Sequence, residues 1–412
     1  MSWRNLICLT CLMAATSTGV AGEWTQWRGP THNNVAEPGQ MVPTTWNDKQ
    51  NVVWKADVPG RGHASPIVAG NLVVLCSAAD DEQIQAVIAL DRSTGKQRWL
   101  KEISRGGFPP THEKNTHASS TAASNGKQIF VTFCHHEKVE AVALDLDGRI
   151  IWRKDVGRFL PEQYKYGYAA SPTIYKDMLI IAGDSDTSAW VQALNVADGQ
   201  VVWEQKRPLF LNWSSPIVAS LPGGDQLLLS GLHMISSYDP STGKVLWQTK
   251  CLTMATCGTC VWENDLIFAS GGYPDAETVA VKADGSGVLW SNKVMCYEQS
   301  MIVHDGYLYA FSDKGIAFCW DAKTGKEMWK ERLQGPVSSS PLLVGDTIFA
   351  TNEAGTTWAF KASPKKYELV AKNQLGDSGF ASLVAVDGKL FIRTSKGDGA
   401  GRKESLYCIG AK

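Results

Sequence analysis

Residues 89–99 read ALDRSTGKQRW, and this stretch decides the fold because versions of it return along the chain. Each version has an apolar run that ends near Asp or Asn, a turn containing Gly, and then a Trp. Further copies occupy residues 143–152, 193–203, 238–247 and 320–329, and a degenerate copy occupies residues 283–290. From Trp54 the spacings between successive repeat tryptophans are 45, 53, 51, 44, 43 and 39 residues. A period of roughly 40 to 50 residues indicates propeller blades or a solenoid.

The composition of each repeat favours strands over helices. Glycine tolerates the positive φ of a tight hairpin turn, and Asp and Asn side chains bond to their own backbone there. The flanking segments 71–76, 128–133 and 178–182 are short, rich in β-formers and bounded by turn residues. No segment has a long apolar stripe with the helical period. A helical solenoid is therefore excluded in favour of a β-propeller.

A second marker counts the blades, because each unit has an inner hairpin that often opens with Ser-Pro. The eight openings are Ser65-Pro66, Ser119-Ser120, Ser171-Pro172, Ser215-Pro216, Gly258-Thr259, Ser300-Met301, Ser340-Pro341 and Ala381-Ser382. After the eighth hairpin only one more strand, 405–409, precedes the end of the chain, whereas the segment 52–58 supplies a spare strand. We predict an all-β, eight-bladed β-propeller over residues 52–412, in which the N-terminal strand closes the last blade.

The repeated tryptophans are interpreted as structural. A large indole at a fixed position in each blade can pack one blade against the next, with its N–H bonded to a neighbouring backbone group. We therefore expect equivalent buried positions for Trp99, Trp152, Trp203, Trp247, Trp290 and Trp329.

Residues 1–22 are predicted to be a signal peptide, followed by an extension over residues 23–51. Arg4 precedes a short apolar run, and Gly19, Val20 and Ala21 offer small residues for cleavage. The protein is thus expected to be exported, periplasmic or secreted. No other stretch approaches the roughly 20 apolar residues of a membrane span. With 40 basic and 41 acidic residues, the chain has no positive surplus for nucleic acid.

The repeat resembles the tryptophan-docking motif of the pyrroloquinoline-quinone (PQQ) propeller repeat, in the pattern Ala-x-Asp-x-x-Thr-Gly-x-x-x-Trp. The resemblance covers nearly all of the mature chain. Two branches of that superfamily bear on function: the quinoprotein alcohol and glucose dehydrogenases, and BamB, a periplasmic protein-binding scaffold without a quinone. The segments Trp24–Pro30 and His112–His117 are similar to those of exported proteins described as PQQ-binding-like or BamB-like.

The sequence lacks features that this resemblance implies for a quinone enzyme. Such enzymes hold PQQ with a Ca²⁺ ion, a Trp floor, an Asp base and, in many members, a disulfide between adjacent cysteines. Here no cysteines are adjacent, and no loop of alternating carboxylates would bind Ca²⁺. Cys257 and Cys260 form a lone CxxC without the following His of a haem site or the second CxxC of a zinc site. The eight cysteines beyond the signal peptide are either disulfide-bonded, which export permits, or buried free thiols.

The loops that precede the inner hairpins are the candidate functional surface. Counted from the repeat tryptophans, two neighbouring loops are the longest: Trp99 to His117 spans 18 residues and Trp152 to Tyr168 spans 16. Function concentrates on long loops held by a rigid scaffold, and aromatic and Arg side chains suit contact surfaces. The binding-surface candidates are His63, His112, His117, Tyr166, Tyr168 and Trp213, with His117, Tyr168 and Trp213 expected at the centre of a concave patch. His112 and His117 lack the spacing of a helical HExxH zinc site, so whether they bind a metal stays open.

The sequence therefore favours a monomeric, exported scaffold without a catalytic site, which binds a protein or another partner in the cell envelope. We expect no cofactor. One alternative is a PQQ- and Ca²⁺-dependent or metal-dependent oxidoreductase, and another is a carbohydrate-binding module, because the fold alone does not decide among them.

Overall fold

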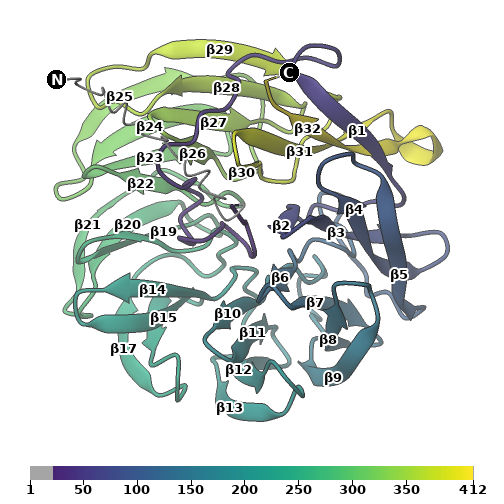
Figure 1. Ribbon diagram of the computed structural model, residues 1–412. Coiled ribbons are helices and arrows are strands. Elements are labelled where there is room, and N and C mark those ends of the chain that lie inside the picture. The colour runs from purple at the N-terminus through teal and green to yellow at the C-terminus, as the bar shows by residue number, and fades with distance from the viewer. Residues whose placement is uncertain (1–21, 412) are drawn as a thin grey trace, which may run out of the picture.

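The computed structural model describes residues 22–411 as a closed ring of eight four-stranded antiparallel sheets (Figure 1). The predicted eight-bladed β-propeller is thus confirmed. The residues assigned to the signal peptide, apart from Gly22, lie outside the described part of the chain. Within that part, no helix has the length and apolar character needed to cross a membrane.

Each blade is a meander whose first strand lies nearest the central axis (Figure 1). Blade 1 contains β2 (Ile67–Ala69), β3 (Leu72–Ala79), β4 (Ile84–Asp91) and β5 (Gln97–Arg105), and blade 2 contains β6 (Ala123–Ser124), β7 (Gln128–His135), β8 (Lys138–Asp145) and β9 (Ile150–Arg158). Blade 3 contains β10 (Thr173–Tyr175), β11 (Met178–Asp184), β12 (Ala189–Asn195) and β13 (Val201–Lys206), and blade 4 contains β14 (Ile217–Leu221), β15 (Gly224–Ser230), β16 (Met234–Tyr238) and β17 (Val245–Lys250).

The remaining blades continue around the ring in sequence order. Blade 5 contains β18 (Val261–Glu263), β19 (Leu266–Gly271), β20 (Glu277–Lys282) and β21 (Val288–Asn292), and blade 6 contains β22 (Ile302–His304), β23 (Tyr307–Phe311), β24 (Ile316–Asp321) and β25 (Glu327–Arg332). Blade 7 contains β26 (Leu342–Val344), β27 (Thr347–Thr351), β28 (Thr356–Lys361) and β29 (Leu369–Gln374). Blade 8 contains β30 (Val384–Val386), β31 (Lys389–Lys396), β32 (Lys403–Ile409) and β1 (Val52–Val58), with a single 3₁₀ turn, η1 (Gly399–Gly401), before β32.

The ring closes as predicted, because the N-terminal strand β1 is the outermost strand of blade 8. It pairs antiparallel with β32 in a register that places Lys55 opposite Tyr407 and Val58 opposite Glu404. Both ends of the propeller domain therefore share one sheet. This pairing leaves blade 8 with four strands like its neighbours and lets it pack against blades 7 and 1.

The repeat tryptophans pack blade against blade. The indole N–H of Trp203 donates to the carbonyl of Pro240 in the next blade at 3.1 Å, and Trp99 bonds to Leu146 in the same way at 2.8 Å. The ring of Trp203 lies against Gly243, whose φ is +72° and which has no room for a Cβ. The Thr-Gly turn thus requires glycine both for its backbone conformation and for the indole that covers it.

Equivalent N–H bonds are made by Trp54, Trp152, Trp290 and Trp329. Trp247 differs, because its N–H donates to Oε1 of Gln226, whose amide nitrogen then bonds to the carbonyl of Ala283. All six predicted tryptophans stand on the outermost strands of their blades, which are equivalent positions. Trp152 and Trp203 are buried as expected, whereas Trp99, Trp247, Trp290 and Trp329 are only partly buried.

A belt of hydroxyl groups around the channel explains why Ser and Thr open the inner hairpins. The hydroxyl on one blade accepts a hydrogen bond from a backbone N–H of the preceding blade, as in Ser300 N to Ser340 Oγ at 3.0 Å and Ser340 N to Ser382 Oγ at 2.9 Å. Four further links of this kind run from Ser65 to Thr121, Thr121 to Ser171, Ser171 to Ser215 and Thr259 to Ser300. These bonds hold neighbouring blades together close to the axis.

A Ser340→Ala variant should lose about 1 to 3 kcal/mol of unfolding free energy, because the buried N–H of Ser300 would be left without an acceptor. Urea denaturation of the purified protein measures this change. The matched control is Ser241→Ala in an exposed turn, which should stay within about 0.5 kcal/mol of the unsubstituted protein. Equal stability of the two variants would show that the belt has no role in holding the blades.

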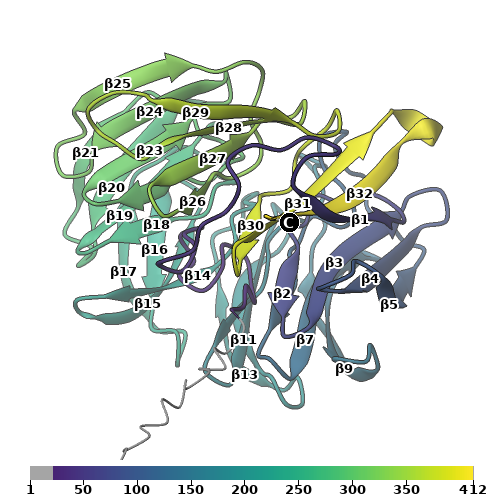
Figure 2. The ribbon, with the colours of Figure 1, turned by 45° about the horizontal axis from the view of Figure 1, so that its top comes forward.

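The extension before β1 runs across the centre of the ring on one side (Figures 1 and 2), where its hydrogen bonds to several blades close that end of the channel. Trp24 forms a bridge with Val68 of β2, and Arg28 donates to the carbonyl of Met301 at 2.7 Å. Further hydrogen bonds join this segment to blades 2, 3, 5 and 7, through residues 25, 26, 33 and 34 respectively. Residues 37–51 then run outward over blade 7, where Trp46 packs on Phe349. We call residues 22–36 the plug.

Candidate binding site

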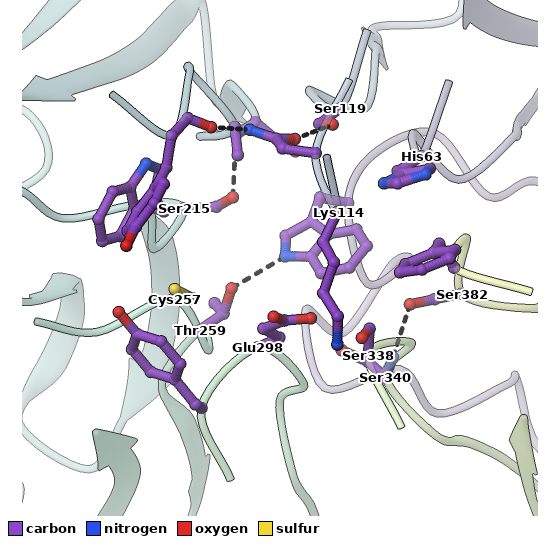
Figure 3. Close-up of a pocket in the computed structure, with 18 of the residues that line it drawn as sticks. His63, Lys114, Ser119, Ser215, Cys257, Thr259, Glu298, Ser338, Ser340 and Ser382 are labelled. Atoms are coloured by element: carbon purple, nitrogen blue, oxygen red, sulfur yellow. Dashed lines mark hydrogen bonds between the residues drawn. The ribbon is translucent and has the colours of Figure 1, made fainter. Parts of the chain in front are cut away.

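The other end of the channel opens into a cavity of about 330 Å³ (Figure 3). Its wall is formed by the loops that precede the inner strands of all eight blades. The aromatic and imidazole groups on the wall are Trp27, His63, His112, Tyr166, Trp213, Tyr297 and Phe380, and most of the other lining residues are polar, including Lys114, Asn115, Glu298 and the hydroxyls of the belt. The cavity is therefore a blind cup with aromatic surfaces and hydroxyl groups.

Trp27 lines the closed end of this cup. Its indole N–H donates to the hydroxyl of Thr259 at 2.9 Å (Figure 3). The plug positions Trp27, because the neighbouring residues Gln26 and Arg28 are bound to blades 3 and 6. Sequence analysis identified Trp27 as part of a family-like segment but not as a lining residue, since only the folded plug brings it to the axis.

Aromatic side chains form one wall of the cup. The rings of Tyr166 and Trp213 lie 5.6 Å apart, and the ring of His112 meets Tyr166 edge-on at 5.0 Å. The indole N–H of Trp213 is fixed by the carbonyl of Gly167 at 2.9 Å. This wall joins the two long loops, because Asn115 of the first loop also donates to the carbonyl of Tyr166 in the second at 2.6 Å.

The first long loop crosses the mouth of the channel. The ammonium group of Lys114 lies 2.9 Å from Oε1 of Glu353 in blade 7, and Glu353 also accepts a bond from Ser338 at 2.6 Å. The hydrogen bond with Glu353 raises the pKa of Lys114. Arg61 supports the same loop by donating to the carbonyl of Glu113 at 2.8 Å. The loop is thus held on both sides of the channel.

Burial shifts the pKa values of several titratable groups on the wall toward the neutral form of each group. Burial lowers the pKa of His63 well below its usual range, with the positive charge of Arg61 as the next contribution, so this ring is neutral. His63 stacks on Phe380 with ring centroids 4.3 Å apart. Burial raises the pKa of the Cys257 thiol and of the Glu298 carboxyl. Burial therefore favours the uncharged forms of these three groups.

Four of the six candidate residues line the cup: His63, His112, Tyr166 and Trp213. The placement of His117 and Tyr168 at its centre was wrong. His117 is bound by Asp80 at 2.8 Å and by the carbonyl of Pro109 at 2.9 Å, and it anchors the first loop outside the cup. Tyr168 points into the blade core, where its hydroxyl donates to the carbonyl of Ala182. Sequence counting also missed Glu298 and Phe380, which lie two residues and one residue before the hairpin openings at Ser300 and Ala381.

The donor set of the cup does not fit a Ca²⁺-bound quinone. Among the described residues that line it, Glu298 is the single carboxylate, whereas Ca²⁺ takes six to eight oxygen ligands. Nowhere between residues 22 and 411 do three or more His, Cys, Asp or Glu side chains gather in a way that could hold a metal ion. The eight cysteines in this range are free thiols, including Cys257 and Cys260 of the CxxC segment.

Fold and site together define a class: an eight-bladed β-propeller of the PQQ-like repeat, with tryptophans docked between blades and a blind cup on its axis. The family described as "Outer membrane protein assembly factor BamB" matches this chain over residues 44–158, 83–327 and 275–405. The chain belongs to this family.

Individual relatives and solved structures show how far the likeness extends. An outer membrane protein assembly factor BamB from Moranella endobia is 23% identical, over 76% of this chain and 79% of that protein. The crystal structure of BamB from Moraxella catarrhalis superimposes with a TM-score of 0.62 at 13% identity, covering 86% of this chain and 99% of that one. A europium-containing methanol dehydrogenase superimposes with a TM-score of 0.69 at 12% identity, covering 95% and 98%. Likeness at this level of identity shows the fold alone.

Proposed function

We propose that this protein is an exported, non-catalytic scaffold that binds a protein of the cell envelope on the face where the cup opens. Its BamB relatives are named as assembly factors of outer membrane proteins, and that role involves contact with other proteins. The proposal includes no cofactor, since the described residues that line the cup include one carboxylate and no group of three or more metal ligands.

The observation that carries the proposal is a cluster of aromatic side chains at the rim of the cup. Tyr166 and Tyr273 are 39% and 41% exposed, which is high for large aromatic side chains. Tyr164 lies between them, with its hydroxyl 2.9 Å from that of Tyr273 and its ring 6.0 Å from that of Tyr166. We call these three tyrosines the rim cluster. Tyrosine is enriched where proteins bind proteins, because it combines a large apolar area with a polar end.

The rim cluster is also held in place before any partner binds. Tyr164 and Tyr166 belong to the second long loop, which is bonded to the first loop through Asn115. Tyr273 comes from the loop between β19 and β20 in blade 5, so the cluster spans blades that are distant in sequence. A preformed surface loses little conformational entropy when it binds, which favours affinity.

The test is photo-crosslinking in the bacterial envelope with benzoylphenylalanine placed at position 166. We expect a crosslinked protein that is absent when the same group stands at position 41. Met41 is the matched control, because it is 88% exposed and lies beside the turns at Gly345 and Gly388 on the plug side of the ring. With the purified partner, the variant Tyr166→Ala, Tyr273→Ala should bind about tenfold or more weakly, since each anchor contributes more than about 1 kcal/mol.

Equal crosslinking from positions 166 and 41, or unchanged affinity of the folded double variant, would contradict a binding surface at the rim. Selective binding of a soluble oligosaccharide in the cup, with no protein captured, would favour the carbohydrate-binding alternative instead.

A further inference from the structure

The backbone nitrogen of Gly22 faces a carboxylate at the start of the plug. It lies 3.0 Å from Oδ1 and 3.2 Å from Oδ2 of Asp387. An amide nitrogen carries one hydrogen and satisfies one of two such oxygens, whereas an ammonium group carries three and can bond to both. The position of Asp387 therefore suits a charged amino group better than it suits a peptide N–H.

The other end of residue 22 is held as well. Arg92 donates from Nη1 to the carbonyl of Gly22 at 3.0 Å, and its Nη2 lies 2.7 Å from Oδ2 of Asp387. Arg92 follows β4 of blade 1, and Asp387 is in the turn between β30 and β31 of blade 8. Residue 22 thus bridges the two blades that meet where the ring closes.

Residue 22 packs closely on Asp387 at the point where docking begins. A Cβ on residue 22 would stand 2.7 Å from Oδ1 of Asp387, so a larger residue here would push this carboxylate aside. The next two residues are anchored in turn, because Glu23 accepts a bond from the N–H of Gly70 at 2.9 Å and Trp24 pairs with Val68. A docked chain that starts at Gly22 would use all these contacts, and one that starts at Glu23 would lose the bridge.

The sequence before this residue meets the requirement of signal peptidase. Gly19 and Ala21 are small residues at the third and first positions before the Ala21–Gly22 bond. We propose that this bond is the processing site, and that the α-ammonium group released on Gly22 pairs with Asp387 to complete the junction of blades 1 and 8. In the cleavage, water adds across the peptide bond. Ala21 leaves as a carboxylate and Gly22 becomes an amine, which is protonated near neutral pH.

This processing site lies one residue earlier than the predicted end of the signal peptide at residue 22. The inference rests on the proposed export, and the two can be tested separately. The full chain, with its signal peptide, is expressed in a Gram-negative host and recovered from the periplasm for N-terminal sequencing and intact mass. A mature chain beginning Gly22-Glu23-Trp24 supports the inference. An exported chain with a different first residue overturns it and leaves export standing, and an intact precursor in the cytoplasm overturns both.

A second measurement tests the ion pair on the mature protein. A nearby carboxylate raises the pKa of an amine by about one unit or more, which lowers the reactive uncharged fraction about tenfold. The α-amino group should therefore react about tenfold faster with an amine-acylating reagent in the folded Asp387→Asn variant than in the unsubstituted protein. The matched control is Asp305→Asn, because Asp305 has the equivalent position in the Asp-Gly turn of blade 6. The φ angle is 51° at Asp305 and 48° at Asp387. Equal labelling rates in all three proteins would overturn the ion pair.

Discussion

An Arg393→Met variant is expected to lose about 3 to 5 kcal/mol of unfolding free energy, because it leaves Glu404 as a buried carboxylate without its main partner. Arg393 on β31 and Glu404 on β32 are both 2% exposed, and Nε of Arg393 lies 2.7 Å from Oε2 of Glu404. The guanidinium group also donates to the carbonyl of Cys76 in blade 1 at 2.7 Å, so it joins the first blade to the last. Equilibrium urea unfolding at neutral pH measures the loss.

Two further variants separate burial from simple loss of charge. Lys138→Met removes an ion pair with Asp155 whose side chains are 39% and 56% exposed, and it should cost less than about 1 kcal/mol. The double variant Arg393→Met, Glu404→Leu should recover much of the stability, since it removes both buried charges together. A single Arg393 variant as stable as the Lys138 variant would contradict the role assigned to the buried pair.

A Trp203→Ala variant should also lose about 3 to 5 kcal/mol, the usual range for removing a buried indole. Trp203 is 8% exposed, covers Gly243 and donates to the carbonyl of Pro240 in blade 4. The substitution therefore opens a cavity between blades 3 and 4 and removes a bond across their junction. Thermal and urea unfolding, followed by circular dichroism, report the change.

The control for this variant is the adjacent residue on the same strand. Val202 is 49% exposed, and Val202→Ala should change stability by no more than about 0.5 kcal/mol. If the two variants were equally stable, the repeat tryptophans would be dispensable for docking the blades, and the explanation of the repeat given above would be wrong.

The blade count and the closure by β1 could be predicted because they depend on local, repeated chemistry. Gly-containing turns, openings with Ser or Thr and spaced tryptophans recur along the chain, and the leftover strand 52–58 has one place to pair. The degree of burial of the tryptophans was less predictable. It depends on how far neighbouring loops cover each indole, and those loops differ between blades even where the Trp position is equivalent.

The cup was only partly predictable because its key contacts join distant residues. Lys114 and Glu353 are 239 positions apart, and Trp27 meets Thr259 across 232. The plug binds mainly to backbone carbonyls and N–H groups, which leave no trace in the side-chain pattern. His117 and Tyr168 were misplaced because the residue before a hairpin can turn toward the axis or into a blade, and loop anchoring by Asp80 and Ala182 settles the direction in these two cases.

The plug also has a consequence for the order of folding. Residues 22–36 are made early in synthesis, yet their hydrogen-bond partners extend to Leu343 and Asp387, which are made near the end. Contacts of such high sequence separation form slowly, because a long chain must be closed into a loop before they give any stabilisation. The plug is thus expected to complete its docking last, although Trp24 can pair with Val68 as soon as blade 1 is made. Until blades 7 and 8 have formed, the rest of the plug is available to folding helpers or to aggregation.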